Sequence, residues 1–461
     1  MSATPVRAEP SPEARALARL ALGFRLADAP DAVRAQARRV VRDTLGVMLA
    51  GARLPEIAGL AAVAPSLGAG VATVFGRDAS AASHVAALVN GAGGVSLELD
   101  EGNQFAVNHP AIHSLPALWA LAEERRLSGA RLIEAFIAAY EIAVRVGRAT
   151  RLRNAVHPFG TTTIVGAALG AARLMDCDED AAARSVEIAA GLSLASSQQA
   201  ANSGASARNL FTGFTNHNGA LAPRLAMAGF CGEPGALASV FGAILGESFA
   251  IDVEPRFESF YILRNYFKIY ACSRWNHAPI EAAAALRRDS RLSLDAVRAI
   301  EVETYDPATR LGGADVAKHS IIFNVAARLA LGANDESVYA QAHVDDPRLR
   351  ALMRVTRVRE DPALTARLPD VRAARVTVTL ADGQSLSALC ERPRGGFDNP
   401  LEPAELEAKF RALAAPTIGD AAARALSDAC ESIEACADVR ALAPLLRPPA
   451  GGAITAREER P

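Results

Sequence analysis

Residues 131–146 read RLIEAFIAAYEIAVRV, and this stretch decides the class of fold. Its apolar side chains recur with the 3.6-residue period of an α-helix, at Leu132, Ile133, Phe136, Tyr140 and Val144. The same pattern predicts helices over 31–47 and 178–195, in a region rich in alanine and leucine from about residue 12 to 265. Small residues dominate 161–172, where they permit helices to approach closely. We therefore expect a large body of packed helices.

Beyond about residue 270 the pattern changes from helical to strand-like. Residues 297–305 and 374–380 alternate β-branched with polar side chains, as half-buried strands do. The sequence ADGQ at 381–384 predicts a hairpin turn, because Asp-Gly readily supplies the positive φ that such a turn needs, and 385–390 is the expected return strand. Helical periodicity resumes at Glu402.

These patterns predict a mainly α protein with an α+β second domain. We expect a large all-helical domain built from both chain ends, residues 1–269 and 396–461, with a smaller α+β lid domain inserted at 270–395. The chain has 461 residues, of which 50% are hydrophobic and 22% charged, so it has ample material for packed interiors and no compositional sign of disorder.

Charge and hydropathy restrict the partners. The net charge is −2 without blocks of like charge, so we expect no nucleic-acid partner, whereas a small anion needs only a few buried cations. The longest uncharged apolar stretches are too short for a membrane span, and the first residues lack the apolar core of a signal peptide. We expect a cytoplasmic protein with no membrane partner.

The familiar cofactor motifs are missing from the sequence. It has no Gly-x-Gly-x-x-Gly, no phosphate loop, no Gly-x-Ser-x-Gly elbow and, among six cysteines, no Cys-x-x-Cys pair. His109 and His113 have the spacing of a zinc helix, but the glutamate of that motif is absent and Pro110 follows the first histidine. We expect neither a metal nor another cofactor.

Four polar segments interrupt the apolar sequence and carry the candidate functional residues. The first, at 90–113, holds Glu98, Asp100, Glu101, Asn108 and His109. The others hold His157 in VHPFGTTT, Arg208 in SGASARNLFTGFTNHNGA, and Lys268, Arg274 and His277 in YFKIYACSRWNHAPIEAA. A fifth, weaker segment holds Lys318 and His319.

Each histidine taken alone is more often a helix cap or a buried hydrogen-bonded residue than a catalyst. The combination of segments favours a functional site, because three of them pair a histidine with a nearby proline and open an alanine-rich run. Helix N-termini present free N–H groups and favour anions. Several of them converging on one cavity would bind a polycarboxylate, with imidazoles and an acid available for proton transfer.

In order and spacing, these segments resemble those of the MmgE/PrpD family. The family's Asn-Gly, acidic and His-Pro motifs are matched by Asn90-Gly91, ELDE at 98–101 and His109-Pro110, and its His-Pro-x-Gly motif by 157–160. Its Lys…Tyr-Pro-x-Cys-Arg-x-x-His motif resembles 268–277, with Ala271 where proline is usual. The resemblance spans about residues 12 to 420 and implies a helical domain, an inserted lid, a homodimer and a cofactor-free site between the domains.

The resemblance also nominates residues. Glu98, His109, His157, Lys268 and His277 fall at the family's active-site positions. Two positions depart from the family's pattern: Arg208 stands where many members have lysine, and Phe323 stands where a tyrosine is usual. An arginine can clamp a carboxylate with two hydrogen bonds but cannot carry a proton, and a phenylalanine can do neither.

The expected chemistry is proton abstraction next to a carboxylate of a small di- or tricarboxylic acid. His157 or His109 would be the base, and Lys268, Arg208, Asp100, Asn108 and Arg274 would bind substrate or developing charge. His277 or Glu98 would assist a leaving hydroxyl or return a proton. Within the family a lyase that removes water, similar to 2-methylcitrate dehydratase, is our first expectation. The alternatives are an iminodisuccinate-type epimerase, a cis-aconitate-type decarboxylase and a non-catalytic carboxylate-binding protein.

Overall fold

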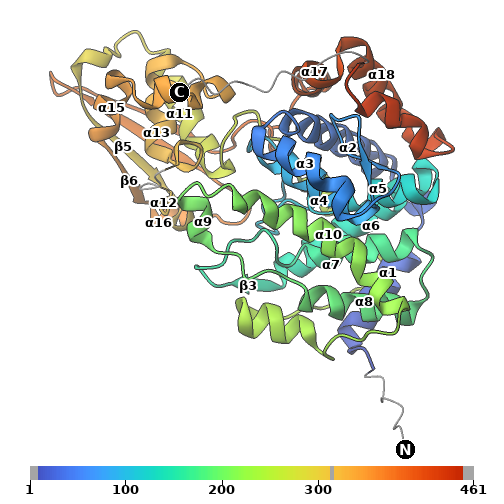
Figure 1. Cartoon of the computed structure of the whole chain (residues 1–461). Coiled ribbons are helices and arrows are strands. Elements are labelled where there is room, and N and C mark those ends of the chain that lie inside the picture. The colour runs from blue at the N-terminus through green and yellow to red at the C-terminus, as the bar shows by residue number, and fades with distance from the viewer. Residues whose placement is uncertain (1–8, 312–315, 450–461) are drawn as a thin grey trace, which may run out of the picture.

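The computed structural model describes residues 9–311 and 316–449, and the remaining residues of both predicted domains lie outside the described part. A mainly α protein with a smaller α+β part is confirmed (Figure 1). The helical body contains α1 (Pro12–Gly23), α2 (Asp31–Gly51), α3 (Pro55–Leu67), α4 (Ser83–Val95), α5 (Leu115–Arg125), α6 (Gly129–Arg148), α7 (Ile164–Leu174), α8 (Glu179–Gly191), α9 (Gln198–Asn202) and α10 (Ala207–Met227). The helices predicted over 131–146, 31–47 and 178–195 are α6, α2 and α8, although α8 ends at Gly191.

The chain returns to the helical body after the α+β part. Helix α17 (Pro403–Ile418) packs against α2, and α18 (Asp420–Glu431) packs on α17 and α2. Figure 1 shows these C-terminal helices in red beside the blue N-terminal ones. Helices from before and after the α+β part therefore pack in one body, while the boundaries near 270 and 395 remain our proposal.

Two short antiparallel ribbons in the helical body were not predicted. They pair β1 (Ala72–Thr73) with β2 (Ser80–Ala81), and β3 (Thr150–Leu152) with β4 (Gly246–Phe249). Strands of this length are too short to show an alternating pattern in sequence. A π-helical segment over Leu237–Ile244, which sequence periodicity did not single out, precedes β4.

The α+β part is a four-stranded sheet covered by helices. Its strand order is β6-β5-β7-β8, from β5 (Val297–Thr304), β6 (Thr356–Glu360), β7 (Ala374–Leu380) and β8 (Ser385–Cys390). The hairpin is confirmed, with Gly383 at a φ of 86° between β7 and β8. Strand β6 pairs in parallel with β5 and was not predicted. Helices α11 (His277–Arg287) and α13 (Ile321–Leu331) contribute to the core of this part, and α12 (Asp306–Thr309), α14 (Gln341–Val344), α15 (Pro347–Arg354) and α16 (Pro362–Thr365) complete it.

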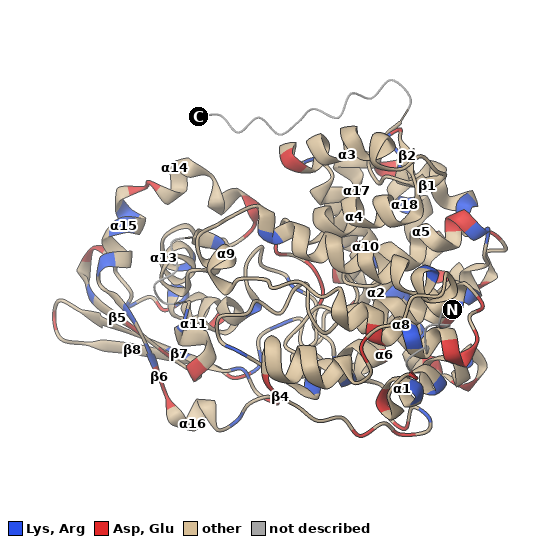
Figure 2. Cartoon of the chain, turned by 60° about the horizontal axis from the view of Figure 1, so that its bottom comes forward, with Lys and Arg blue, Asp and Glu red and all other residues tan. Residues whose placement is uncertain are grey.

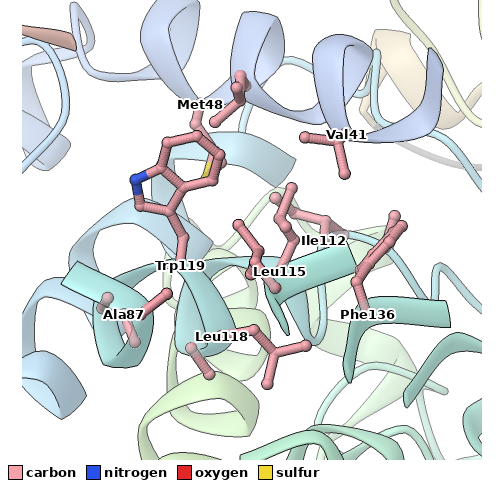
Figure 3. Packing of buried hydrophobic residues seen from close by; sticks show 14 of the residues in the cluster. Val41, Met48, Ala87, Ile112, Leu115, Leu118, Trp119 and Phe136 are labelled. Carbon is pink, nitrogen blue, oxygen red and sulfur yellow. The ribbon is translucent and has the colours of Figure 1, made fainter. Parts of the chain in front are cut away.

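The centre of the helical body is a close-packed apolar core. Figure 3 shows Trp119 and Leu115 of α5 facing Met48 of α2, with Phe136 of α6 nearby. The Trp119 ring meets Phe75 edge to face, with ring centroids 6.1 Å apart. Aromatic burial of this kind is a large contribution to the stability of a core. The core thus fixes α2, α5 and α6, which flank the polar loop between α4 and α5.

The outside of the molecule carries mixed charge. Figure 2 shows basic and acidic residues interspersed over both parts. No single helix of the described residues is long and apolar enough to cross a membrane, and α2 and α3 pass that test only as a pair bent by 94°.

Small residues on α7 allow it to lie directly on α6. A Cβ atom added at Gly166 would lie 2.3 Å from the carbonyl oxygen of Ala139, an atom of the α6 backbone that cannot move aside. We expect Gly166→Ala to lower the free energy of unfolding by about 1–3 kcal/mol because the two helices must separate. The change should appear as a lower melting temperature.

The matched control is Gly59→Ala on exposed α3, where an added Cβ atom meets nothing within 4 Å. Alanine is a better helix former than glycine, so this variant should gain about 0.5–1 kcal/mol. Equal melting temperatures for the two variants would contradict the close approach of α6 and α7.

Candidate active site

A small cavity lies where the helical body meets the α+β part. Its volume is about 90 Å³. From the helical body it is lined by Glu98, Val107, His109, His157, Pro158, Phe159, Gln198, Ala201 and Arg208. From the segment that leads into the α+β part, and from that part itself, come Tyr266, Lys268, Ser273, Arg274, Trp275, Leu311, His319 and Arg372. The cavity therefore gathers side chains that are up to about 270 residues apart in sequence.

Glu98 sits in a cradle of basic side chains. Its Oε2 accepts a hydrogen bond from Lys268 Nζ at 3.0 Å, and its Oε1 is paired with the Arg208 guanidinium and lies 3.6 Å from His319 Nε2. Burial alone would raise the pKa of Glu98, but Arg208 and Lys268 hold it well below the usual range of a glutamate. Glu98 has a positive φ of 55°, a strained conformation for a non-glycine residue. These ion pairs hold the residue in that conformation.

Asp100 links the cradle to His109. Its Oδ1 accepts a hydrogen bond from Lys268 Nζ at 3.1 Å, and its Oδ2 lies 2.6 Å from His109 Nδ1. Burial works to raise the pKa of Asp100, but His109 and Lys268 lower it to about 2. The same network raises the pKa of Lys268 despite its complete burial, so carboxylates and ammonium are all charged at neutral pH.

The tautomer of His109 follows from its neighbours. Nδ1 lies 2.6 Å from the Asp100 carboxylate and 2.7 Å from the backbone carbonyl oxygen of Glu101, both of which can only accept hydrogen bonds. Nδ1 must therefore carry a hydrogen. In the neutral ring, Nε2 then keeps the lone pair and is the basic nitrogen, as in the histidine–aspartate pairs of hydrolases.

His157 has the opposite tautomer. Its Nδ1 accepts a hydrogen bond from the backbone N–H of Phe159 at 3.2 Å, so the hydrogen of the neutral ring resides on Nε2. Burial lowers the pKa of His157 well below its usual value, and Arg208 and His319 lower it further. His157 is therefore a neutral hydrogen-bond donor at neutral pH, in a cavity where the neutral His109 ring offers a lone pair and where His319 is a third imidazole.

Phe159 and Asn108 hold these groups in place. The Phe159 ring makes edge contacts with the rings of His109 and His157, with centroids 4.9 and 4.6 Å apart, and the Arg208 guanidinium stacks over it at 4.5 Å. Asn108 donates to the Pro158 carbonyl at 3.1 Å and accepts from the His109 N–H at 2.9 Å. Asn108 and Asp100 are buried behind the cavity and do not line it, so they act through their neighbours.

His277 lies outside the cavity lining. Its ring is fully buried, and Nδ1 accepts a hydrogen bond from Arg274 Nη1 at 2.9 Å. Burial, together with Arg274 and Lys268, holds the pKa of His277 well below its usual value. An imidazole that is covered and held neutral in this way could give a proton to a substrate only through a change at Arg274, so its role as proton donor stays a prediction.

Three lining residues were missed or undervalued from the sequence. His319 belonged to the weak fifth segment, whereas its neighbour Lys318 turns away to pair with Glu336 at 3.0 Å. Tyr266 opens the polar segment YFKIYACSRWNHAPIEAA but was not itself nominated, and Arg372 lies in no segment that the sequence marked. Phe323, one of the two departures from the family pattern, is buried outside the lining with its ring 5.8 Å from that of Tyr339.

In the described part of the chain, no group of three or more His, Cys, Asp or Glu side chains is placed to hold a metal ion. Both ring nitrogens of His113 have partners, with Nδ1 at 2.7 Å from the His109 carbonyl oxygen and Nε2 at 3.1 Å from the Thr212 hydroxyl. His113 therefore supports the turn that carries His109.

The fold and the cavity together define a two-part, mainly α protein with a cation-rich cavity lined by histidines. The sequence model of the MmgE/PrpD N-terminal domain matches residues 15–247, and that of the MmgE/PrpD C-terminal domain matches residues 270–435. The chain belongs to the MmgE/PrpD family.

Several relatives match over almost the whole chain. The chain is similar to a cis-aconitate decarboxylase of Aspergillus terreus (strain NIH 2624 / FGSC A1156), with 25% identity covering 92% of this chain and 93% of the relative. The human cis-aconitate decarboxylase is 25% identical, covering 93% of each chain. That of Mus musculus is 23% identical, covering 93% of this chain and 92% of the relative.

The two tautomers can be observed directly. Long-range ¹H–¹⁵N NMR at neutral pH should show His109 with hydrogen on Nδ1 and a bare Nε2, and His157 with a bare Nδ1 and hydrogen on Nε2, because of the partners described above. His109→Gln and His157→Gln would assign the signals. Finding the same tautomer in both rings would contradict the hydrogen-bond network.

Glu101 provides a test by pH. Its Oε1 accepts a hydrogen bond from the Tyr140 hydroxyl at 2.5 Å, and burial raises the pKa of Glu101 to about 8. The unfolded chain loses this proton near pH 4.5, whereas the folded protein keeps it up to about pH 8. The free energy of unfolding therefore falls as pH rises through this window, by up to about 1.4 kcal/mol per pH unit.

Glu101→Gln removes this titration and keeps an oxygen for Tyr140. We expect the melting temperature of the variant, relative to the unchanged protein, to rise progressively between about pH 5 and pH 8. Glu391→Gln, at an exposed position, is the control and should show no such trend. A constant difference across this range would show that Glu101 is ionised in the folded protein.

Proposed function

We propose that this chain is a lyase that acts on a small polycarboxylate and that its reaction is decarboxylation. The observation that carries the proposal is the charge of the cavity. Four lining side chains, Arg208, Lys268, Arg274 and Arg372, are cationic. Among the described lining residues Glu98 is the one carboxylate; Asp100 lies behind Lys268, and Glu281 acts on Arg274 from outside the lining. The lining itself therefore carries more positive than negative charge before any imidazole is counted, which suits a substrate with at least two carboxylates.

The relatives favour decarboxylation over dehydration. All three are named cis-aconitate decarboxylases, and each match covers nearly the whole chain. Dehydration, the first expectation from the family resemblance, has no such support. At about 25% identity the class of reaction is carried over more safely than the particular acid, so the proposal names a polycarboxylate class and not one compound.

Decarboxylation breaks the bond between a carbon atom and its carboxylate. Carbon dioxide leaves, and the bonding electron pair stays on the substrate, where a neighbouring carboxylate can delocalise it. Lys268 and Arg208 are placed to hold that carboxylate, and the neutral His157 Nε2–H can donate a hydrogen bond to its growing charge, as a neutral imidazole does in other enzymes. The carbon then takes a proton from Nε2 of a protonated His109, whose positive charge Asp100 stabilises.

Dehydration is the second candidate, because the hydrogen bond between His109 Nδ1 and Asp100 leaves Nε2 free to act as a base. A neutral His109 would remove a proton next to a carboxylate, and another group would return a proton to the departing hydroxyl. The two reactions need opposite protonation states of His109.

One experiment separates the candidates. The protein is incubated in deuterated water with a panel that includes cis-aconitate, citrate and 2-methylcitrate, and is followed by NMR and by release of carbon dioxide. Release of one carbon dioxide with one deuteron in each product supports the proposal. Loss of water without carbon dioxide indicates a dehydratase, and exchange without net loss indicates an epimerase. Binding without any reaction would identify a carboxylate-binding protein and overturn the lyase proposal.

Replacing His109 and replacing His157 should lower kcat by different amounts. His109→Gln removes the proton carrier, so kcat should fall by about 10²–10⁴ with little change in KM. His157→Gln keeps an N–H donor, so its kcat should fall by only about tenfold. His343→Gln changes a partly buried ring outside the cavity, whose Nδ1 contacts the Ser337 carbonyl, and it should leave kcat and KM unchanged. A larger loss for His157→Gln than for His109→Gln would exchange the two roles.

A further inference from the structure

The cationic side chains of the cavity fall into two groups with different partners. Arg208 and Lys268 are matched by Glu98 and Asp100. Arg274 and Arg372 are not matched in this way. In residues 9–311 and 316–449, the hydrogen-bond partners of their guanidinium groups are backbone carbonyls and the His277 imidazole.

Most N–H donors of the Arg274 guanidinium already have acceptors within the protein. Nη1 donates to His277 Nδ1 and to the Arg394 carbonyl, both at 2.9 Å, and Nη2 donates to the Pro393 carbonyl at 3.0 Å. The guanidinium also stacks on the Tyr266 ring at 4.8 Å. Arg274 thus contributes positive charge to the cavity, but three of its hydrogen bonds already go to His277 and to the backbone at 393–394.

Against the described residues, Arg372 keeps N–H donors to spare. It is only partly buried, and one Nη2 hydrogen bond, to the Gln104 carbonyl at 2.9 Å, uses one of its five N–H groups. The Gln104 side chain in turn donates to the carbonyls of Pro369 and Asp370 at 2.8 and 3.0 Å. Arg372 is therefore fastened to the loop that carries Glu98 and His109, although it belongs to the segment before β7.

Two guanidinium groups that face one small cavity repel each other, and an anion between them relieves the repulsion. We propose that Arg372 is a specificity-determining residue that holds a second carboxylate of the substrate, in addition to the one held by Arg208 and Lys268. This inference rests on the proposed function and adds to it the residue that distinguishes polycarboxylates from monocarboxylates. Ligands with one carboxylate need only the Arg208 and Lys268 side, whereas di- and tricarboxylates use both.

The test measures binding, so that it is independent of turnover. Propane-1,2,3-tricarboxylate and butyrate are titrated by calorimetry into the unchanged protein, Arg372→Gln, Arg372→Lys and the control Arg375→Gln. Arg375 lies three residues further on, in β7, where it pairs with Glu303 at 3.5 Å. Melting temperatures of all variants are recorded without ligand.

We expect Arg372→Gln to weaken tricarboxylate binding by about 10- to 100-fold and to leave butyrate binding unchanged, because only the second carboxylate loses its partner. Arg372→Lys should lose less, since it keeps the charge without the fork, and Arg375→Gln should lose nothing. If Arg372→Gln is poorly folded, the tricarboxylate-to-butyrate affinity ratio of Arg372→Lys decides.

Two results would overturn the inference. Equal tricarboxylate affinity for Arg372→Gln and the unchanged protein, or an equal loss for both ligands, would show that Arg372 does not hold a second carboxylate, and would leave the proposed function standing. Failure of the unchanged protein to bind the tricarboxylate would overturn the proposed substrate class as well.

Discussion

The site depends on the ion pairs that the buried Lys268 ammonium makes with Glu98 and Asp100. The ammonium lies within hydrogen-bond distance of carboxylates on the loop between α4 and α5, 3.0 Å from Glu98 and 3.1 Å from Asp100. A buried charge is tolerated only when it is paired, and removal of one partner leaves the other at a cost of several kcal/mol. Lys268 leads into the α+β part, and Arg208 of α10 completes the pairing of Glu98. The same charges that stabilise one another therefore join the two parts of the molecule at the cavity.

The C-terminal helices support this network from behind. Lys409 of α17 donates to the Leu99 carbonyl at 2.9 Å and lies 2.7 Å from Asp43 of α2, which is itself buried. Leu99 lies between Glu98 and Asp100, so the end of the chain holds the carboxylate loop from the side away from the cavity. This explains why α17 must return to the helical body after the α+β part.

The charged and histidine side chains of the cavity have three different roles. Glu98 and Asp100 neutralise the cations that are most deeply buried, and Asp100 also orients His109. His157 is kept neutral by burial and by neighbouring positive charge, so that it can donate a hydrogen bond without carrying a charge of its own. The positive charge that remains unmatched, on Arg274 and Arg372, gives the cavity its preference for anions.

The sequence by itself determined the kind of elements and most of the charged and imidazole side chains of the cavity. Periodicity alone indicates α6 and the β7–β8 hairpin, because each has a regular pattern over many residues. The polar segments identified Glu98, His109, His157, Arg208 and Lys268, which interrupt apolar sequence and line the cavity. Parallel pairing of β6 with β5 left no such local signal, since it depends on a partner more than fifty residues away.

Only the tertiary structure decided which histidines face the cavity and how each is protonated. His277 and His319 look alike in sequence, as polar residues beside the start of a helix, yet His277 is buried behind Arg274 while His319 lines the cavity. Arg372 has no motif at all and reaches the site because β7 is packed against the rest of the sheet. Protonation and exposure are set by neighbours that are distant in the chain, through burial and Coulomb interactions that act across space, and a linear pattern does not contain those distances.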